Sequence, residues 1–304
     1  HNMSKIEVVE VGPRDGFQSV RCAAPIASEL KLEVIDKLIA AGVKHMEYTS
    51  FVSPKAIPQL ADAQTVTEAV MKKYPGLDLF ALVPNLRGAQ NAYELGLRKV
   101  CYVVSLSKSH NKANINRTHE QSLEAYQEIR AAYPDLEVVV DLATTFGCPF
   151  EGKYNDSQAV VNFLKDYADA GMTTCCLCDT IGIADPAQVK SVIGELKASY
   201  PNLQLQVHFH DTRGLGMVNT MAAIESGVTE VQSALGGLGG CPFAPGASGN
   251  LSTEDMVWML NEMGFKTGVS FSKVLEAAKF QAIHIPGNYS GHHIHIEQES
   301  PCKF

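Results

Sequence analysis

Two histidines stand at the end of a short apolar run in the last third of the sequence. His208 and His210 close the run that starts at Leu203, at positions i and i+2. Residues two apart on a β-strand project from the same face, so both imidazoles can reach one metal ion. Taken alone, a His-x-His pair is more often a packed pair than a ligand pair. The residues that other segments bring to the same place must decide between these interpretations.

Polar side chains follow other apolar runs at the same relative point. They are Arg14, Asp15, Glu47 and Asp179, joined by Cys241, Ser248 and Asn250 from a Gly-rich loop after the last run. In a barrel of parallel strands, the carboxyl ends of the strands meet at one rim. Each residue alone fits a solvated strand end, but their joint placement predicts an active site. Asp15 adds an oxygen ligand to the two histidines, and such a set suits Mg²⁺, Mn²⁺ or Zn²⁺.

The Gly-rich loop, residues 236–250, is too long for a tight connection. Its glycines are typical of hinges, so the loop is predicted to form a mobile lid over the barrel mouth. Such a lid would bring Cys241 to a bound substrate, where the thiol could act as an acid or base. The alternative is a phosphate-binding nest, which is common after the last strands of such barrels. No lysine stands immediately at a strand end, so the sequence favours metal-assisted carbonyl chemistry over a Schiff base.

The elements that must position these residues alternate along the chain. Eight strand-like apolar runs are predicted, at Ile6–Val11, His45–Tyr48, Leu77–Val83, Val100–Leu106, Glu137–Leu142, Thr174–Leu177, Leu203–His208 and Val228–Ala234. Helical patterns lie between them, with apolar residues three and four apart. Eight such units fit an α/β fold, a (β/α)₈ TIM barrel of about 250 residues, better than a doubly wound sheet. We expect one domain over residues 3–304, with the barrel over about 5–265 and a C-terminal helical extension over 266–304.

Composition excludes several classes of protein. The 304 residues carry 25 Lys and Arg against 33 Asp and Glu, a net charge of −8 with no basic run, so nucleic-acid binding is not expected. No apolar run approaches the about 20 residues of a membrane helix. The eight cysteines are scattered, which favours reduced thiols in the cytoplasm. The run Cys175–Cys178 would alternate faces on a strand, so we predict buried thiols there and no metal cluster.

Five motifs resemble the 3-hydroxy-3-methylglutaryl-CoA (HMG-CoA) lyase family of metal-dependent Claisen-type enzymes. They are Glu10–Gln18 (EVGPRDGFQ), Thr49–Lys55 (TSFVSPK), Asp179–Gly182 (DTIG), His208–Thr212 (HFHDT), and Gly237–Asn250 with the following Thr253–Asp255. The resemblance runs in order from about Ile6 to Phe280. It implies cleavage of HMG-CoA to acetyl-CoA and acetoacetate, by a divalent-metal-assisted mechanism with Mg²⁺ or Mn²⁺ and with Zn²⁺ as a further option.

Roles for individual residues also follow from the resemblance. It makes Asp15, His208, His210 and Asn250 the metal ligands, Arg14 the support for the enolate oxygen, and Cys241 the thiol of proton transfer. Glu47 and Asp179 would be acid/base or orienting carboxylates, and His208 is a second candidate for the last proton transfer. Arg14 and Gln18 are expected to bind substrate, an acyl-CoA or 3-hydroxy acid. A homodimer is the family-level expectation for assembly.

The sequence departs from the family pattern around the substrate. Residues 285–293 carry no lysine or arginine where the family has a basic stretch associated with CoA. Arg213, close to His210, could instead pair a second carboxylate of the substrate. These departures keep open a related lyase or aldolase acting on another 3-hydroxy acid. A non-catalytic metal-binding protein is less favoured, because it would need neither Arg14 nor Cys241. The run His292–His295 is expected to be an exposed tail that binds metal adventitiously.

Overall fold

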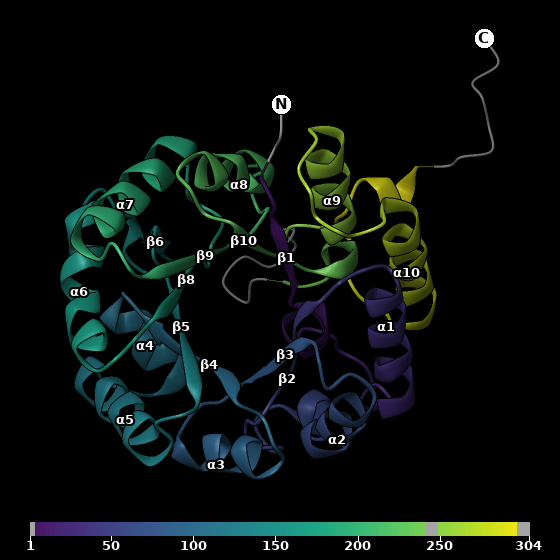
Figure 1. The fold of residues 1–304 in the computed structure, drawn as a ribbon, viewed down its shortest axis with the longest axis horizontal. Helices are drawn as coiled ribbons and strands as arrows, with labels where there is room; N and C mark the ends of the chain where they lie inside the picture. The colour runs from purple at the N-terminus through teal and green to yellow at the C-terminus, as the bar shows by residue number, and fades with distance from the viewer. Residues whose placement is uncertain (1–3, 241–248, 297–304) are drawn as a thin grey trace.

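Eight parallel strands close into a barrel in the computed structural model, which describes residues 4–240 and 249–296 (Figure 1). The strands are β1 (Glu7–Glu10), β2 (His45–Ser50), β3 (Asp78–Leu82), β4 (Lys99–Ser105), β5 (Glu137–Ala143), β8 (Thr174–Asp179), β9 (Gln204–Phe209) and β10 (Glu230–Ser233). β1 pairs with both β2 and β10, which closes the ring. The TIM-barrel prediction is confirmed, and each predicted apolar run overlaps one of these strands. A short hairpin of β6 (Gly147–Cys148) and β7 (Gly152–Lys153) stands apart from the barrel.

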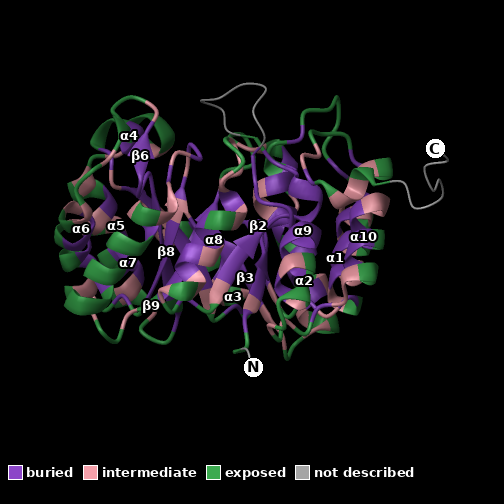
Figure 2. Cartoon of the chain, turned by 90° about the horizontal axis from the view of Figure 1, so that it is seen from above, coloured by how far each residue is buried: buried purple, intermediate pink, exposed green. Residues whose placement is uncertain are grey.

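Helices surround the barrel and turn their buried faces toward it (Figure 2). They are α1 (Ser28–Ala40), α2 (Ala63–Lys73), α3 (Leu86–Glu94), α4 (Lys108–Ile115), α5 (His119–Ala132), α6 (Ser157–Asp169), α7 (Pro186–Ser199), α8 (Gly216–Glu225), α9 (Thr253–Glu262) and α10 (Phe271–His284). In α7 the buried residues Val189, Val192, Ile193 and Leu196 recur at the predicted spacing. Asp185 caps this helix by accepting a hydrogen bond from the Gln188 backbone N–H.

The sequence did not predict α3 or α4, and both are short and polar. In α4, Ala113 and Ile115 are the apolar residues, so hydrophobic periodicity could not reveal the helix. Its start is set by Ser107, whose side chain accepts a hydrogen bond from the His110 backbone N–H. The sequence pattern also predicts a single helix over Pro58–Lys73, whereas α2 begins at Ala63 and Pro58–Leu60 forms a separate 3₁₀ turn.

Side chains alternate between the outside and the inside of the barrel wall, and β8 shows this clearly. The Cys175 side chain packs in the large apolar core between strands and helices, whereas Cys176 and Cys178 join a smaller cluster inside the barrel. The six cysteines among the described residues are free thiols, and Cys175 and Cys176 are buried. The prediction of buried thiols on alternating faces is therefore confirmed for these residues.

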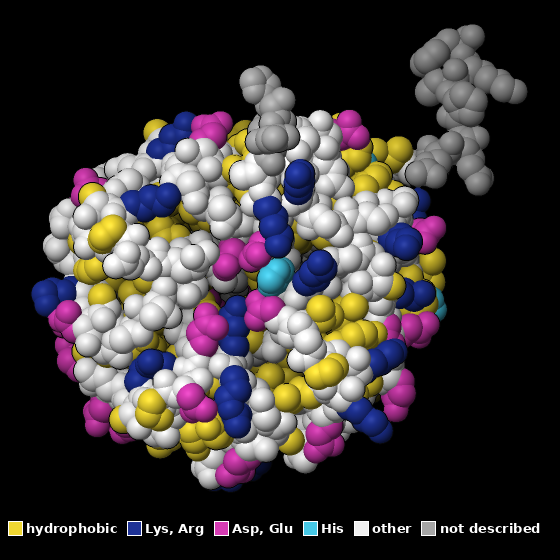
Figure 3. Space-filling model, in the orientation of Figure 1, with side chains coloured by type: hydrophobic (Ala, Val, Ile, Leu, Met, Phe, Trp, Pro, Cys, Tyr) yellow, Lys and Arg dark blue, Asp and Glu magenta, His cyan; other side chains and the backbone are white. Residues whose placement is uncertain are grey.

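Ion pairs occupy the amino end of the barrel. Figure 3 shows acidic and basic side chains gathered near the barrel axis on the face that it presents. His45, Asp78 and Lys99 begin β2, β3 and β4, and Asp78 accepts from His45 Nδ1 at 2.8 Å and from Lys99 Nζ at 2.9 Å. These three groups satisfy one another's charge and hydrogen bonds. The residues predicted to do chemistry follow the other ends of the strands, at the carboxyl end of the barrel.

The C-terminal segment docks onto the barrel. α10 packs against α1 and α9. Backbone N–H groups of His292 and His293 donate to the Asp255 carboxylate, and the His293 ring lies beside Trp258 and Phe271. The expectation of an exposed tail is thus wrong for His293, because the Asp255 carboxylate at the start of α9 binds both its backbone N–H and its ring. No helix in residues 4–240 and 249–296 is both long and apolar enough to cross a bilayer.

Buried Glu10 fastens the seam where the first and last strands meet. Its carboxylate accepts hydrogen bonds from the backbone N–H groups of Gly12 and Leu235, each at 2.8 Å, and from the Thr253 hydroxyl at 2.7 Å. Burial raises the pKa of Glu10 to about 7, although these hydrogen bonds oppose the shift. One side chain therefore joins β1, the segment after β10 and the first turn of α9.

Replacing Glu10 with leucine is expected to destabilise the fold by about 3–5 kcal/mol, because three buried donors lose their acceptor at about 1–3 kcal/mol each. Urea unfolding followed by circular dichroism measures the change. The exposed Glu124→Leu on α5 serves as the control and should shift the free energy of unfolding by no more than about 0.5 kcal/mol. A loss below about 1 kcal/mol for Glu10→Leu would contradict the role given to this side chain.

Candidate active site

A tight π-helical turn places Arg14 and Asp15 at the carboxyl end of β1. The turn spans Gly12–Gly16, and the Asp15 backbone N–H donates to the Val11 carbonyl at 2.8 Å. Pro13 is the second residue of the turn, where its missing N–H costs nothing. The sequence predicted these two residues at the strand end but did not reveal the turn that aims them inward.

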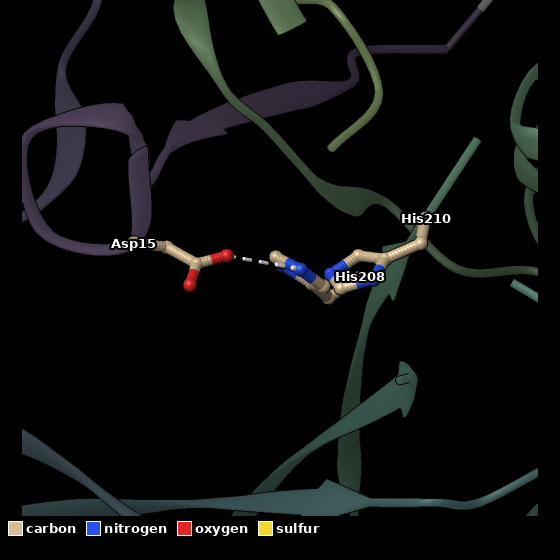
Figure 4. A group of neighbouring side chains, drawn as sticks. All are labelled: Asp15, His208 and His210. Atoms are coloured by element: carbon tan, nitrogen blue, oxygen red, sulfur yellow. Dashed lines mark ion pairs between the residues drawn. The ribbon is translucent and has the colours of Figure 1, made fainter. Parts of the chain in front are cut away.

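Asp15, His208 and His210 converge at this end of the barrel (Figure 4). The Asp15 Oδ2 atom lies 3.6 Å from His208 Nε2, and the two imidazole centroids are 5.1 Å apart. One ligand atom from each of the three side chains lies within 4.8 Å of the others. Asn250 joins them through a β-bridge with His210. The structure thus brings all four predicted metal ligands into one region.

Two buried polar atoms in this group test whether a metal ion fits. His210 Nδ1 and Asn250 Oδ1 are buried and make no hydrogen bond to another described residue. A buried acceptor without a partner is costly, and a cation supplies the missing interaction. The donor set of two imidazole nitrogens, a carboxylate oxygen and an amide oxygen suits a divalent first-row metal or Mg²⁺. The residues present therefore fit such an ion.

Electrostatics keep these side chains in the form that binds metal. Burial raises the pKa of Asp15, but the Arg14 guanidinium and the two histidines outweigh it and lower the pKa to about 2. Burial lowers the pKa of His208, and it lowers the pKa of His210 to about 4. At neutral pH the carboxyl is ionised and both imidazoles are neutral, as metal ligation requires.

The Arg14 side chain is held on several sides. Its Nε donates to Glu47 Oε1 at 2.9 Å, and its Nη1 donates to Asp15 Oδ1 at 3.3 Å and Gln18 Oε1 at 3.2 Å. These bonds leave the second terminal nitrogen without a partner among the described residues. A buried guanidinium with a fixed orientation and a free N–H edge can stabilise negative charge that develops beside the metal site.

Comparison with known proteins identifies the family. The family model described as HMGL-like matches residues 5–280. The chain belongs to the HMGL-like family. It is 42% identical to the hydroxymethylglutaryl-CoA lyase YngG of Bacillus subtilis over 278 residues, 91% of this chain and 92% of that protein. The resemblance drawn from the sequence motifs is confirmed.

Solved structures agree in fold over nearly the whole chain. A crystal structure of the HMG-CoA lyase of Bacillus subtilis matches with a TM-score of 0.89 and 40% identity, covering 96% of this chain and 97% of that one. A structure of an HMG-CoA lyase from Acinetobacter baumannii, in complex with coenzyme A and 3-methylmalate, matches with a TM-score of 0.86 and 36% identity. That alignment covers 99% of this chain and 98% of the other.

In this HMGL-like chain, two further predicted site residues organise the loop after β8. The Asp179 carboxylate accepts from the backbone N–H groups of Ile183 and Ala184 at 2.9 and 3.1 Å. Arg213 Nη1 donates to the carbonyl oxygens of Ile181 and Gly182 at 2.8 and 3.0 Å. Both residues therefore fix backbone near the site. Cys241 and most of the predicted lid lie outside the described residues.

Sequence analysis missed a carboxyl cluster inside the barrel. Cys101 Sγ donates to Glu47 Oε2 at 2.6 Å, and Asp141 lies against this pair from β5. Burial, together with the neighbouring Glu47 charge, raises the pKa of Asp141 to about 8. Its Oδ1 is buried without a hydrogen-bond partner in the described part of the chain. The one available signal was a charged residue inside the apolar run Glu137–Leu142.

The protonation of Asp141 predicts a pH dependence of stability. Because the folded pKa lies above that of the unfolded chain, folding retains a proton between about pH 4 and 8, and stability falls as pH rises through this window. The Asp141→Asn variant has no carboxyl to titrate at this position, so it does not lose this stability as pH rises. Its stability relative to the parent protein should rise by about 1–3 kcal/mol between pH 5 and 8 and then level off.

Urea unfolding at several pH values, with EDTA present throughout, measures this difference. The exposed Asp166→Asn on α6 is the control and should give a flat difference over the same range. A flat difference for Asp141→Asn would show that Asp141 is ionised in the folded protein.

Proposed function

We propose that this protein is a carbon–carbon lyase that cleaves HMG-CoA to acetyl-CoA and acetoacetate with a bound divalent cation. The observation that carries the proposal is the convergence of Asp15, His208, His210 and Asn250 beside the oriented guanidinium of Arg14. Two of these four side chains have a buried polar atom with no partner in the described part of the chain. Relatives named hydroxymethylglutaryl-CoA lyases, 38–42% identical over about nine-tenths of this chain, support the same reaction.

In this proposal Asp15, His208, His210 and Asn250 hold the cation. When bound, such an ion lowers the pKa of the tertiary hydroxyl of the substrate and neutralises oxygen charge. Mg²⁺ or Mn²⁺ suits the oxygen ligands, and Zn²⁺ suits the two imidazoles equally well. The choice of metal belongs to the proposal.

The chain's own residues then divide the remaining work. We assign Asp179 to accept the hydroxyl proton, because its carboxylate lies near His210 and each of its oxygens keeps a second lone pair beside its backbone hydrogen bond. The bond between C2 and C3 breaks, the hydroxyl carbon becomes the ketone of acetoacetate, and the electron pair stays on the acetyl-CoA fragment as an enolate. Arg14, held by Glu47 and Gln18, stabilises that oxygen as its charge appears.

Protonation of the enolate carbon completes acetyl-CoA, and we assign this step to Cys241. His208 is the other candidate, but both of its ring nitrogens are committed. Its Nδ1 pairs with Gln232 Oε1 at 2.9 Å, and its Nε2 faces Asp15 in the proposed metal site. Arg213 would support substrate binding indirectly, because its guanidinium bonds to the backbone of the loop after β8.

The decisive assay is acetoacetate release from HMG-CoA with Mn²⁺ or Mg²⁺, and again with excess EDTA. Cleavage that EDTA abolishes is expected. Asp15→Asn should weaken Mn²⁺ binding at least about tenfold, because an anionic ligand is lost. Absence of cleavage by protein shown to bind Mn²⁺ in calorimetry would reject HMG-CoA as the substrate.

One observation favours a second candidate, a lyase for a different 3-hydroxy acid or acyl-CoA. The Asp141 carboxyl, whose pKa burial raises to about 8, lies near Arg14 with an oxygen that has no partner among the described residues, and such a group suits a polar substituent on the substrate. A panel of 3-hydroxy acids and their thioesters separates the candidates. Turnover of a free acid, or of a thioester with a polar substituent, in preference to HMG-CoA would establish the second.

Removal of the Cys241 thiol is expected to slow turnover by about 10²–10⁴-fold, the usual contribution of a positioned proton donor. Mn²⁺ binding should stay the same, since the thiol is not among the proposed ligands. The measurement is kcat for Cys241→Ala, with Cys22→Ala as the control because Cys22 is an exposed thiol. Full activity in Cys241→Ala would move the proton transfer to another group.

Assembly and location complete the proposal. We propose a homodimer formed through the barrel helices, where a groove of about 300 Å³ between α7, α8 and α9 exposes Met217, Val218, Met221 and Met259. We also propose a cytoplasmic location, because the six cysteines in the described part of the chain form no disulfide.

A further inference from the structure

A row of hydrogen-bonded side chains runs through the barrel interior and ends on His208. Glu230 Oε2 accepts from Gln206 Nε2, Gln206 Oε1 accepts from Gln232 Nε2 at 3.2 Å, and Gln232 Oε1 pairs with His208 Nδ1 at 2.9 Å. The four residues come from adjacent strands β9 and β10, and Glu230 stands opposite Gln206 in the register. Gln206, Gln232 and His208 are all more than nine-tenths buried.

The carboxylate at one end gives this row a direction. An ionised carboxylate only accepts hydrogen bonds, so Gln206 must turn its NH₂ group toward Glu230 and its carbonyl toward Gln232. Gln232 must then donate to that carbonyl, which leaves its own carbonyl facing the ring of His208. Reversing either amide would oppose two donors or two acceptors inside the barrel, where Gln206 and Gln232 are both buried.

The direction of the row determines which ring nitrogen of His208, at its other end, carries the hydrogen. Facing a carbonyl oxygen, Nδ1 must carry the hydrogen, so the neutral ring has a bare Nε2. That Nε2 points at the Asp15 carboxylate, 3.6 Å away, which is where the proposed cation would lie. The row therefore decides which nitrogen offers its lone pair.

The neighbouring imidazole is held differently. His210 Nδ1 is buried without a hydrogen-bond partner among the described residues, and a backbone hydrogen bond with Thr180 acts on that ring. The row of side chains inside the barrel ends on His208 and does not reach His210. Ligands whose tautomer is set by a hydrogen bond on the far ring nitrogen bind metal more tightly.

We propose that Gln232, oriented by Glu230 through Gln206, is a positioning residue that holds His208 in the Nδ1–H tautomer with Nε2 ready for a divalent cation. The part of this statement that concerns the cation rests on the proposed function. The tautomer does not, since it is a property of the metal-free protein.

Nuclear magnetic resonance of ¹⁵N-histidine-labelled protein in EDTA tests the tautomer, with the signals of His208 assigned from the spectrum of His208→Asn. The parent protein should show a protonated Nδ1 and a bare Nε2. Gln232→Met has nearly the same volume but no acceptor, and it should show a mixture of the two tautomers. Gln232→Glu loses the donor to Gln206 Oε1 but keeps an oxygen against Nδ1, so His208 should keep the parent pattern.

Glu230→Gln tests the direction of the row from its far end without touching His208. An amide at this position can donate as well as accept, so His208 should again populate both tautomers. Glu7→Gln is the matched control, because Glu7 stands opposite Glu230 in the register and carries the same charge outside the row. It should leave the spectrum unchanged. Thermal unfolding of each variant confirms that the protein examined is folded.

Manganese binding, measured by calorimetry, gives the second readout. Gln232→Met should bind Mn²⁺ about 10–100-fold more weakly than the parent protein, and Gln232→Glu should bind it within about threefold. The Nδ1–H tautomer persisting in both Gln232→Met and Glu230→Gln would overturn the proposal. If the parent protein failed to bind Mn²⁺, the proposed function would fall, whereas the tautomer measurement would still decide the role of Gln232.

Discussion

The positive charge of Arg14 is the constraint on which the open end of the barrel depends. Asp15, Glu47 and Asp141 all lie close enough to interact with this guanidinium, and one cation cannot offset three carboxylates. The guanidinium lowers the pKa of Asp15, which bonds to it directly, whereas burial raises the pKa of Asp141 to about 8. Asp141 therefore keeps its proton at neutral pH. A divalent cation bound next to Asp15 would favour release of that proton.

The two ends of the barrel handle buried charge in different ways. At the amino end, His45, Asp78 and Lys99 satisfy one another directly. At the carboxyl end the groups are incompletely satisfied within the described residues, where buried atoms of His210, Asn250 and Asp141 have no hydrogen-bond partner. Unsatisfied polar atoms destabilise a fold unless a ligand completes them. The contrast separates the end of the barrel that maintains the structure from the end that is arranged to bind.

Sequence patterns revealed the strand ends but not the barrel interior. The eight strands and the placement of Arg14, Asp15, Glu47, His208 and His210 followed from apolar periodicity and from the rule that barrel strands end at one rim. Cys101, Asp141, Gln206 and Gln232 were missed because a residue inside an apolar run looks the same whether it faces the helices or the barrel axis. Only the register of neighbouring strands shows which of them meet. The partners of Asp179 and Arg213 are backbone groups of a loop, and side-chain pattern carries no information about those.

The β1–β10 seam has a consequence for how the protein reaches its native state. Asp15 lies near the start of the chain and Asn250 near its end, and Glu10 bonds the first strand to segments that follow the last. Contacts between such distant parts of a chain form late, because closing the long loop between them costs entropy before the contacts contribute any stabilisation. During synthesis, one edge of β1 stays unpaired until β10 has emerged. Metal capture at this site would therefore be among the last events of folding, and a truncated chain would lack it.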